Sequence, residues 1–269
     1  MKRYPSDLTD EEWEIIKEIL DHEDPYTTGR PAEVDQREVL NAIFYSNATG
    51  CQWRYLPKDF PLYTTVSDYY HKWIRNGIWQ KINTALRQQL RKKVGCNENP
   101  SAGIIDSQSV KGTPESSIES GVDGGKLVKG RKRHIVTDTI GCLLIVVVHA
   151  ANIPAGKGAK KILEKLFDIL DTLELIWADG AYAGEWVAWV YEMFGCVLEI
   201  VKKKKAKGFH VLPRRWVVER TLAWLTRYRR LSKDYERNPS SSEAMVYIAS
   251  IRLMLKRLIK PVEQVEMAA

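Results

Sequence analysis

Three carboxylates lie where they could hold a metal ion. Asp106 follows a short apolar run, and Asp179 follows the apolar residues 175–178. Acids at the carboxyl ends of strands lie where open α/β sheets commonly bind ligands. Glu219 is the single acid in a strongly basic predicted helix. Hard oxygen ligands of this kind suit Mg²⁺, which takes one or two carboxylates and keeps positions for water and phosphate oxygens.

Each of these acids also has a purely structural interpretation. An aspartate at a strand end often forms a turn. Glu219 lies four residues after Arg215, the spacing of an ion pair within a helix. The residues alone leave both interpretations open, and only the joint pattern favours a metal site.

The elements that must position these acids follow from the hydrophobic pattern. We expect strands near 104–106, 133–139, 142–149, 173–177 and 196–202, and helices near 158–170, 184–194, 213–231 and 242–258. Ile140-Gly141 predicts a hairpin between the second and third strands. Three strands followed by alternating helices and strands indicate a mixed α/β sheet.

The N-terminal residues 1–95 have a different pattern, with helices expected near 9–21, 35–48, 64–75 and 78–93. The helix near 64–75 presents polar side chains that include Thr65 and Lys72. This pattern suits either a helix-turn-helix DNA reader or a plain helical bundle. The segment GCNENP then marks a boundary, so a second domain is expected over 101–262.

The charge of the chain favours a polyanionic partner. The 269 residues carry a formal net charge of +7, although residues 1–24 hold nine acids and three bases. Basic residues concentrate at 126–133 and at 202–233, where Trp and Tyr side chains are interleaved with the arginines. Such a mixture can neutralise phosphates and stack on bases, whereas a basic run is otherwise a solvated surface.

The composition is that of a globular protein, with 44% hydrophobic and 28% charged residues. No apolar run reaches the roughly 18 residues of a membrane span, and the N-terminus has no signal-peptide pattern, so we expect a cytoplasmic protein. The glycine-containing segments 121–125 and 156–158 lack the spacing of a nucleotide-binding loop. His134 and His149 lie in predicted strands and are interpreted as structural.

Seven segments, spread in order along nearly the whole chain, match one known family: RYPSDLTDEEW, GRP, CQWRYLPKDFP, DSQSVKG, VKGRKRHIVTDTIG, WADGAYAG and RRWVVERTLAWLTRYRRLSKDYE. On these segments the chain resembles bacterial insertion-sequence transposases of the DDE type, in the superfamily that joins insertion-sequence families four and five. The resemblance implies an α/β fold, a ribonuclease-H-like mixed sheet flanked by helices, with an N-terminal all-helical DNA-binding region.

The resemblance also implies a mechanism. Asp106, Asp179 and Glu219 would form the acidic triad that binds Mg²⁺, with Mn²⁺ as a substitute, and Mg²⁺ pairs of this kind clamp both oxygens of an in-line displacement. The substrate would be DNA, cut at the terminal inverted repeats of the element and joined to target DNA. The protein would act as a homo-oligomer in a synaptic complex.

The residues expected to contact DNA are basic or polar. Thr226 stands where the family has a basic residue seven positions after the glutamate, and Arg227 follows it. The expected contacts are Lys129, Arg131, Lys132, Arg215, Arg227, Arg230, Thr65 and Lys72. Two other functions remain open: a ribonuclease-H-like nuclease without strand transfer, and an inactive or domesticated sequence-specific DNA-binding protein.

Overall fold

Four helices form the N-terminal part of the protein in the computed structural model, which describes residues 3–25, 34–116, 118–201 and 215–262. They are α1 (Asp10–Glu23), α2 (Gln36–Thr49), α3 (Tyr63–Arg75) and α4 (Ile78–Lys93), with a 3₁₀ turn, η1 (Trp53–Tyr55), before α3. The Thr9 hydroxyl and the Glu12 carboxylate cap the start of α1 reciprocally. The predicted helices are confirmed, with ends within two residues of those expected.

A six-stranded mixed sheet forms the second part. Its strands are β1 (Ala102–Lys111), β2 (Gly121–Asp123), β3 (Val128–Asp138), β4 (Leu143–Ala150), β5 (Leu175–Ala178) and β6 (Val197–Ile200). β3 is antiparallel to β1, β2 and β4, whereas β5 is parallel to β1 and β6 is parallel to β5. Three antiparallel strands followed by parallel strands give the ribonuclease-H-like mixed α/β fold that we expected.

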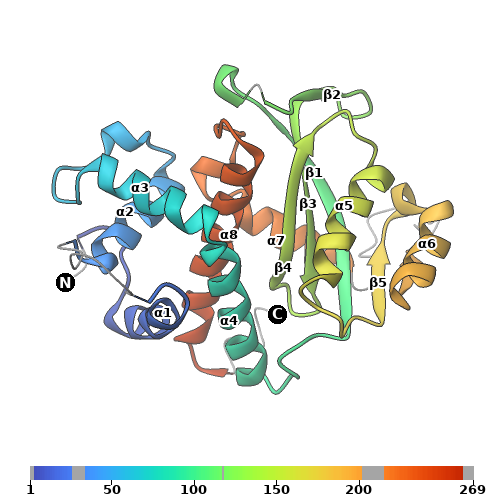
Figure 1. The fold of residues 1–269 in the computed structure, drawn as a ribbon, viewed down its shortest axis with the longest axis horizontal. Helices are drawn as coiled ribbons and strands as arrows, with labels where there is room; N and C mark the ends of the chain where they lie inside the picture. The colour runs from blue at the N-terminus through green and yellow to red at the C-terminus, as the bar shows by residue number, and fades with distance from the viewer. Residues whose placement is uncertain (1–2, 26–33, 117, 202–214, 263–269) are drawn as a thin grey trace, which may run out of the picture.

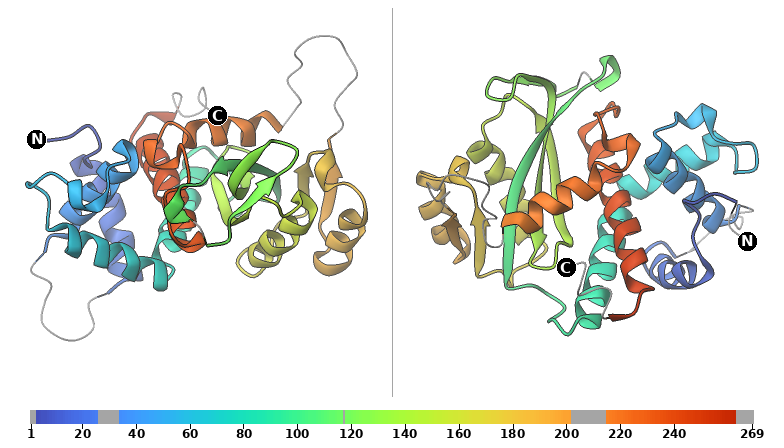
Figure 2. Two further views of the ribbon diagram at one scale, coloured as in Figure 1. Left: turned by 90° about the horizontal axis from the view of Figure 1, so that it is seen from above. Right: turned by 180° about the vertical axis from the view of Figure 1, so that it is seen from behind.

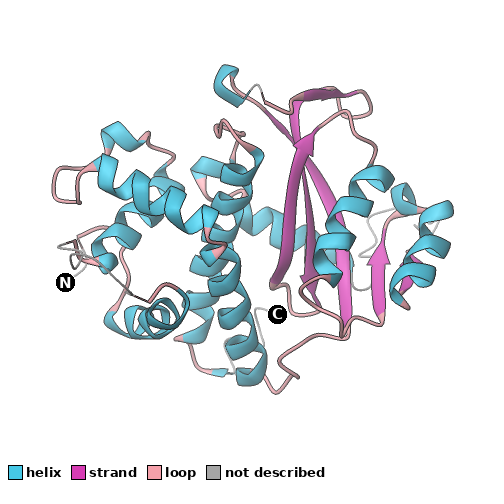
Figure 3. Cartoon of the chain, viewed as in Figure 1, coloured by secondary structure: helices cyan, strands magenta, loops and turns pink. Residues whose placement is uncertain are grey.

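Helices cover both faces of this sheet (Figure 1, Figure 3). α5 (Ala155–Phe167) packs on β3 and β4, and α6 (Glu185–Phe194) packs on β6. On the other face, α7 (Arg215–Leu225) crosses β1 and β3, as Figure 2 shows from behind, and α8 (Pro239–Leu258) packs on β4. Neighbouring strand residues belong to different cores, because Ile135 joins the α7 and α8 side and Val136 joins the α5 side.

The N-terminal helices and the sheet share one hydrophobic core. α8 lies between them and is buried on nearly all sides, from Ala244 to Leu255. Buried hydrogen bonds also cross the boundary predicted near residues 95–101. Tyr70 donates to the Ser241 carbonyl at 2.7 Å, and Asn83 donates to the Leu143 carbonyl at 2.8 Å. The described residues among 1–95 therefore have no core that is separate from the sheet.

Three expectations about the elements were wrong. β1 continues to Lys111, so Asp106 lies within the strand and not at its end. The basic segment 126–133 lies mostly in β3, where several of its side chains are buried. α7 ends at Leu225 and a 3₁₀ turn, η4 (Arg229–Leu231), follows. The expected helix start at 213 lies outside the described residues.

Candidate active site

The sheet brings Asp106 and Asp179 together. β1 and β5 are parallel, with Ile104 opposite Trp177, so the register carried two residues further sets Asp106 beside Asp179. Asp179 directly follows β5 and caps a short 3₁₀ turn, η3 (Gly180–Tyr182), by accepting the Ala181 N–H at 2.9 Å. The side chain of Asp179 remains one-third exposed. The two acids therefore meet at one position along neighbouring strands.

Helix α7 supplies the third acid. Val217, Val218 and Thr221 are buried against the sheet, and the Thr221 hydroxyl donates to the Gly141 carbonyl at 3.1 Å. This anchoring leaves Glu219 on the open side of the helix, with its side chain 56% exposed. The carboxylate is therefore accessible to a ligand from solvent.

Arg215 links the acids. Its guanidinium is almost completely buried, and Nη2 lies 3.3 Å from Glu219 Oε1 and 3.9 Å from Asp179 Oδ2. The pairing with Glu219 is the one that the helical spacing predicts, and it includes Asp179 as well. The structural and the functional interpretation of Glu219 are thus compatible, because one arginine holds both acids at the same site.

The other three groups lie close enough to Asp106 for their charges to act on it. Burial is the main cause that raises the pKa of Asp106, and the negative charges of Asp179 and Glu219 raise it further. The Ser107 N–H, which donates to Asp106 Oδ1 at 2.7 Å, and the positive charge of Arg215 lower the same pKa. A carboxyl that is buried beside two other acids gains from any cation that neutralises the group.

The donor set suits a hard divalent cation in chemistry, since it offers only carboxylate oxygens from three elements. Throughout the described segments, no three His, Cys, Asp or Glu side chains are already spaced to hold a metal ion. The Arg215 guanidinium lies between Asp179 and Glu219, where it supplies the positive charge. The carboxylates therefore fit a hard divalent cation by their chemistry, while in this structure Arg215 neutralises two of them.

Tyr182 was missed at the sequence level. Its side chain is buried beneath the η3 turn, and burial raises the pKa of its phenol. The negative charges of Asp106 and Asp179 raise that pKa too, whereas the hydroxyl of Ser107 and the charge of Arg215 lower it. Tyr182 therefore lies close enough to both aspartates for their charges to act on its phenol. The signal in the sequence was its position three residues after Asp179.

His134 and His149 form a buried pair on the α5 face of the sheet. Their ring nitrogens lie 2.7 Å apart, and His149 Nδ1 lies 2.8 Å from the Ala150 carbonyl. Burial lowers the pKa of both rings, that of His134 to about 3. Gly158 passes so close that a Cβ there would lie 2.3 Å from the His134 ring. The pair is neutral and has the packing of a structural element.

The residues expected to contact DNA fall into two groups. Lys129 and Arg227 are exposed, and Thr65 and Lys72 are half-buried on α3. Lys72 pairs with Asp24 at 2.8 Å. Tyr70 of the same helix is fully buried.

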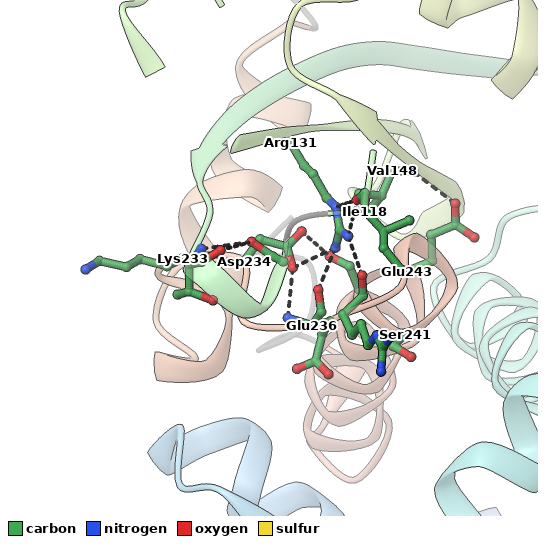
Figure 4. A network of polar contacts seen from close by, with 12 residues as sticks. Ile118, Arg131, Val148, Lys233, Asp234, Glu236, Ser241 and Glu243 are labelled. Atoms are coloured by element: carbon green, nitrogen blue, oxygen red, sulfur yellow. Dashed lines mark hydrogen bonds and ion pairs between the residues drawn. The ribbon is translucent and has the colours of Figure 1, made fainter. Parts of the chain in front are cut away.

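The other group is buried, which corrects the expectation of phosphate contacts. Arg131 is 0% exposed, and its guanidinium donates to the backbone carbonyls of Ile118, Glu236 and Arg237 and pairs with Asp234 at 3.3 Å (Figure 4). A guanidinium with its donors satisfied inside the protein cannot reach DNA. Arg131 instead attaches β3 to the segment before α8.

The expected phosphate contacts of Lys132 and Arg230 are corrected for the same reason. The Lys132 ammonium donates to the Ile153 carbonyl at 2.9 Å and lies 3.5 Å from Asp123. Arg230 pairs with Glu236 at 2.7 Å and donates to the Cys51 carbonyl at 3.1 Å. Both side chains are less than one-tenth exposed. Their charges stabilise the fold and are absent from the surface.

A ribonuclease-H-like sheet with three acids and an arginine at one position defines the class of metal-dependent enzymes that act on nucleic-acid phosphates. Comparison with known proteins gives the family. Residues 97–254 match the family described as "Transposase DDE domain", and residues 8–83 match "Putative transposase of IS4/5 family". The chain therefore belongs to the DDE transposase family.

One curated relative is the "Putative transposase for insertion sequence element IS402" of Burkholderia cepacia. It is 31% identical over 115 residues, which cover 40% of this chain and 54% of the relative. The chain thus spans about half the length of that relative. No solved structure matches the chain significantly. Within the described part of the chain, no helix has both the length and the apolarity that a membrane span requires.

Proposed function

We propose that this protein is a DNA transposase that binds the terminal inverted repeats of an insertion sequence, cleaves the DNA there and joins the ends to target DNA. The observation that carries the proposal is the meeting of Asp106, Asp179 and Glu219 with Arg215 on one face of the sheet. The family to which the chain belongs supports it. If DNA of a bacterial host is the substrate, the protein would act in the cytoplasm.

The three acids would be the ligands of a divalent metal, Mg²⁺ or Mn²⁺. When bound, such ions activate an attacking oxygen and stabilise the departing one. Asp106 is mostly buried in a strand and provides a rigid ligand, whereas Glu219 is exposed and can adjust to the substrate. Arg215 pairs with Asp179 and Glu219 in the free protein and its side chain is 7% exposed, so a contact with a DNA phosphate would require its guanidinium to leave these acids.

The exposed cations would hold the DNA backbone. Lys129 and Arg227 lie on the surface of the catalytic half, and Arg215 lies at its centre. Thr65 and Lys72 are two turns apart on α3, so they share one face of that helix. We assign the reading of inverted repeats to this face. A homo-oligomer would bring two DNA ends together.

The test uses the DNA that flanks the reading frame, with Mg²⁺ or Mn²⁺, and three isosteric variants: Asp106→Asn, Asp179→Asn and Glu219→Gln. Mutating a residue that hydrogen-bonds to a metal ligand typically costs about 10–100-fold in metal affinity or activity. Replacing a ligand itself should therefore lower the cleavage rate by about 100-fold or more. Binding of the ends, measured by gel shift, should persist. Glu164→Gln is the matched control, because this exposed acid lies on α5.

The readout also separates the alternatives. Joined products support a transposase, whereas cleavage without joining would identify a nuclease of the same fold. Binding without any cleavage by the parent protein would identify a DNA-binding protein that lacks catalysis. A parental cleavage rate in Asp179→Asn would contradict the assignment of the triad.

A further inference from the structure

Three arginines are buried around the turn that joins β3 to β4. Arg87 and Arg91 lie on α4, Arg257 lies on α8, and each of these residues is less than one-tenth exposed. The two helices pack side by side, and both contact β4 (Figure 1). Positive charge is therefore concentrated where the N-terminal helices, α8 and the sheet meet.

Asp138 is the acid that faces these cations. Its Oδ2 pairs with Arg91 Nη1 at 2.9 Å, and its Oδ1 accepts the N–H groups of Ile140 and Cys142 at 3.1 and 2.7 Å. Both carboxylate oxygens are thus already occupied, and the side chain is 0% exposed. Three guanidinium groups and one carboxylate leave a net charge of +2 in this group of described residues.

Arg87 is the cation without an acceptor. The residue is 3% exposed, and its Nε and Nη1 have no hydrogen-bond partner in the segments that the structure describes. Arg257 donates through Nη1 and Nη2 to the Ile140 carbonyl, both at 3.3 Å, but its Nε is also buried without a partner. A buried donor that lacks an acceptor is destabilising, and more so when it is charged.

The other groups nearby do not remove this charge. Burial raises the pKa of the Cys142 thiol, so the thiol stays neutral although Arg257 Nη1 lies 3.7 Å from its sulfur. Burial lowers the pKa of Arg87, and the charge of Arg91 lowers it further, whereas the charge of Asp138 raises it. A guanidinium nevertheless keeps its proton in proteins. The excess positive charge therefore calls for an anion from solution.

We propose that Arg87 and Arg257 bind a small inorganic anion, of the size of chloride, beside Cys142. The charges of both arginines act on Cys142, so one anion there can interact with both guanidinium groups. It would accept hydrogen bonds from the donors that lack partners, and buried charges in proteins are generally paired. This inference does not depend on the proposed function, because none of these three residues is assigned to DNA or to the metal.

The anion would hold three parts of the molecule together. Arg87 belongs to the N-terminal helices, and Arg257 attaches α8 to the turn through the Ile140 carbonyl. The next carbonyl of the turn, that of Gly141, accepts the hydroxyl of Thr221 on α7. Because α7 carries Glu219, binding of the anion would stabilise the turn against which the helix of the third acid rests.

The first experiment locates the anion. Bromide replaces chloride and scatters X-rays anomalously, so crystals of the full-length protein are soaked in sodium bromide. We expect an anomalous peak in contact with the Arg87 guanidinium, and no peak there in crystals of Arg87→Met. Peaks that lie only beside exposed lysines and arginines would mean an adventitious ion only and would overturn the proposal.

The second experiment measures urea unfolding at constant ionic strength, with chloride exchanged for the larger anion gluconate. An anion that binds only the folded protein should lower the unfolding equilibrium constant about 100-fold at a concentration of about 100 times its Kd. Arg87→Met should lose this dependence on chloride. In gluconate it should be at least as stable as the parent, since an unpaired buried charge has been removed.

Arg75→Met is the matched control, because Arg75 is exposed at the end of α3. This variant should keep the dependence of the parent on chloride. A general effect of chloride on the protein surface would instead persist in all variants, including Arg87→Met, and that result would contradict the site.

The remaining outcome is also decisive. Equal stability of the parent in chloride and gluconate, without a bromide peak at Arg87, would overturn the proposal and leave buried water as the partner of these guanidinium groups. Neither experiment contains DNA, so failure of the anion site would leave the transposase assignment as it stands.

Discussion

Lys129 and Arg131 lie two residues apart on β3, yet only one of them is available to DNA. Lys129→Ala should leave the free energy of unfolding within about 0.5 kcal/mol of the parent. It should remove about one phosphate contact, which lowers the slope of log affinity against log salt concentration by about 1. Arg131→Ala should instead destabilise the protein by about 3–5 kcal/mol, because Asp234 is left buried and charged without its partner.

The comparison of these two variants uses urea unfolding and DNA affinity measured at several salt concentrations. Equal stability of both variants would show that the Arg131 contacts with the segment before α8 do not hold in solution. An unchanged salt dependence in Lys129→Ala would remove Lys129 from the DNA contacts.

The buried histidine pair makes the stability depend on pH. The pKa of His134 is lowered to about 3 by burial, so the unfolded chain binds a proton below about pH 6.5 that the folded protein does not bind. The stabilisation is therefore complete above pH 6.5 and is lost as the pH falls toward 3. The contribution of His134 to the change in the free energy of unfolding approaches about 1.4 kcal/mol per pH unit.

Urea unfolding between pH 7 and pH 4 measures this slope. His134→Gln should be less stable at pH 7 and should flatten the decline. His22→Gln is the control, because the His22 side chain is 83% exposed. A parent whose stability does not fall over this range would contradict the neutral, buried state of the pair.

At the scale of elements, local patterns predicted most helices correctly. Thr9 and Glu12 mark the start of α1, and Gly50, with a φ of 76°, ends α2. These signals act within one turn of the helix, so a short window of sequence contains them. The strand pattern predicted that Asp106 and Asp179 follow apolar segments of neighbouring strands, but it placed Asp106 at the end of its strand and the structure places it inside β1.

The errors have a different physical origin, since they depend on contacts between distant segments. Polar residues 107–109 suggested the end of a strand, but β1 continues because β3 pairs with it along its whole length. Arg131 and Arg133 looked like surface cations, but carbonyls about 100 residues later in the chain accept their hydrogen bonds. No local pattern contains such partners.

At the scale of the whole molecule, α8 joins the two halves. Arg252 on α8 pairs with Glu12 on α1 at 2.6 Å, and both side chains are buried. Arg252→Met should cost about 3–5 kcal/mol, because the Glu12 carboxylate loses its partner inside the protein. Tryptophan fluorescence and helical circular dichroism should still report a single transition at lower urea, because the core is shared.

Lys256→Met is the control for this prediction, because Lys256 is exposed on the same helix. It should change the free energy of unfolding by less than about 0.5 kcal/mol. Two separate transitions in the parent protein would show that the N-terminal helices fold as an independent unit.

The shared core also has a consequence for synthesis on the ribosome. The N-terminal helices are complete at Lys93, but α8, against which they pack, begins at Pro239. At a synthesis rate of about 5–20 residues per second, the apolar faces of α1 to α4 remain uncovered for roughly 7–30 s before α8 is made. A messenger that ends before α8 would yield a chain whose apolar helix faces stay exposed to chaperones and proteases.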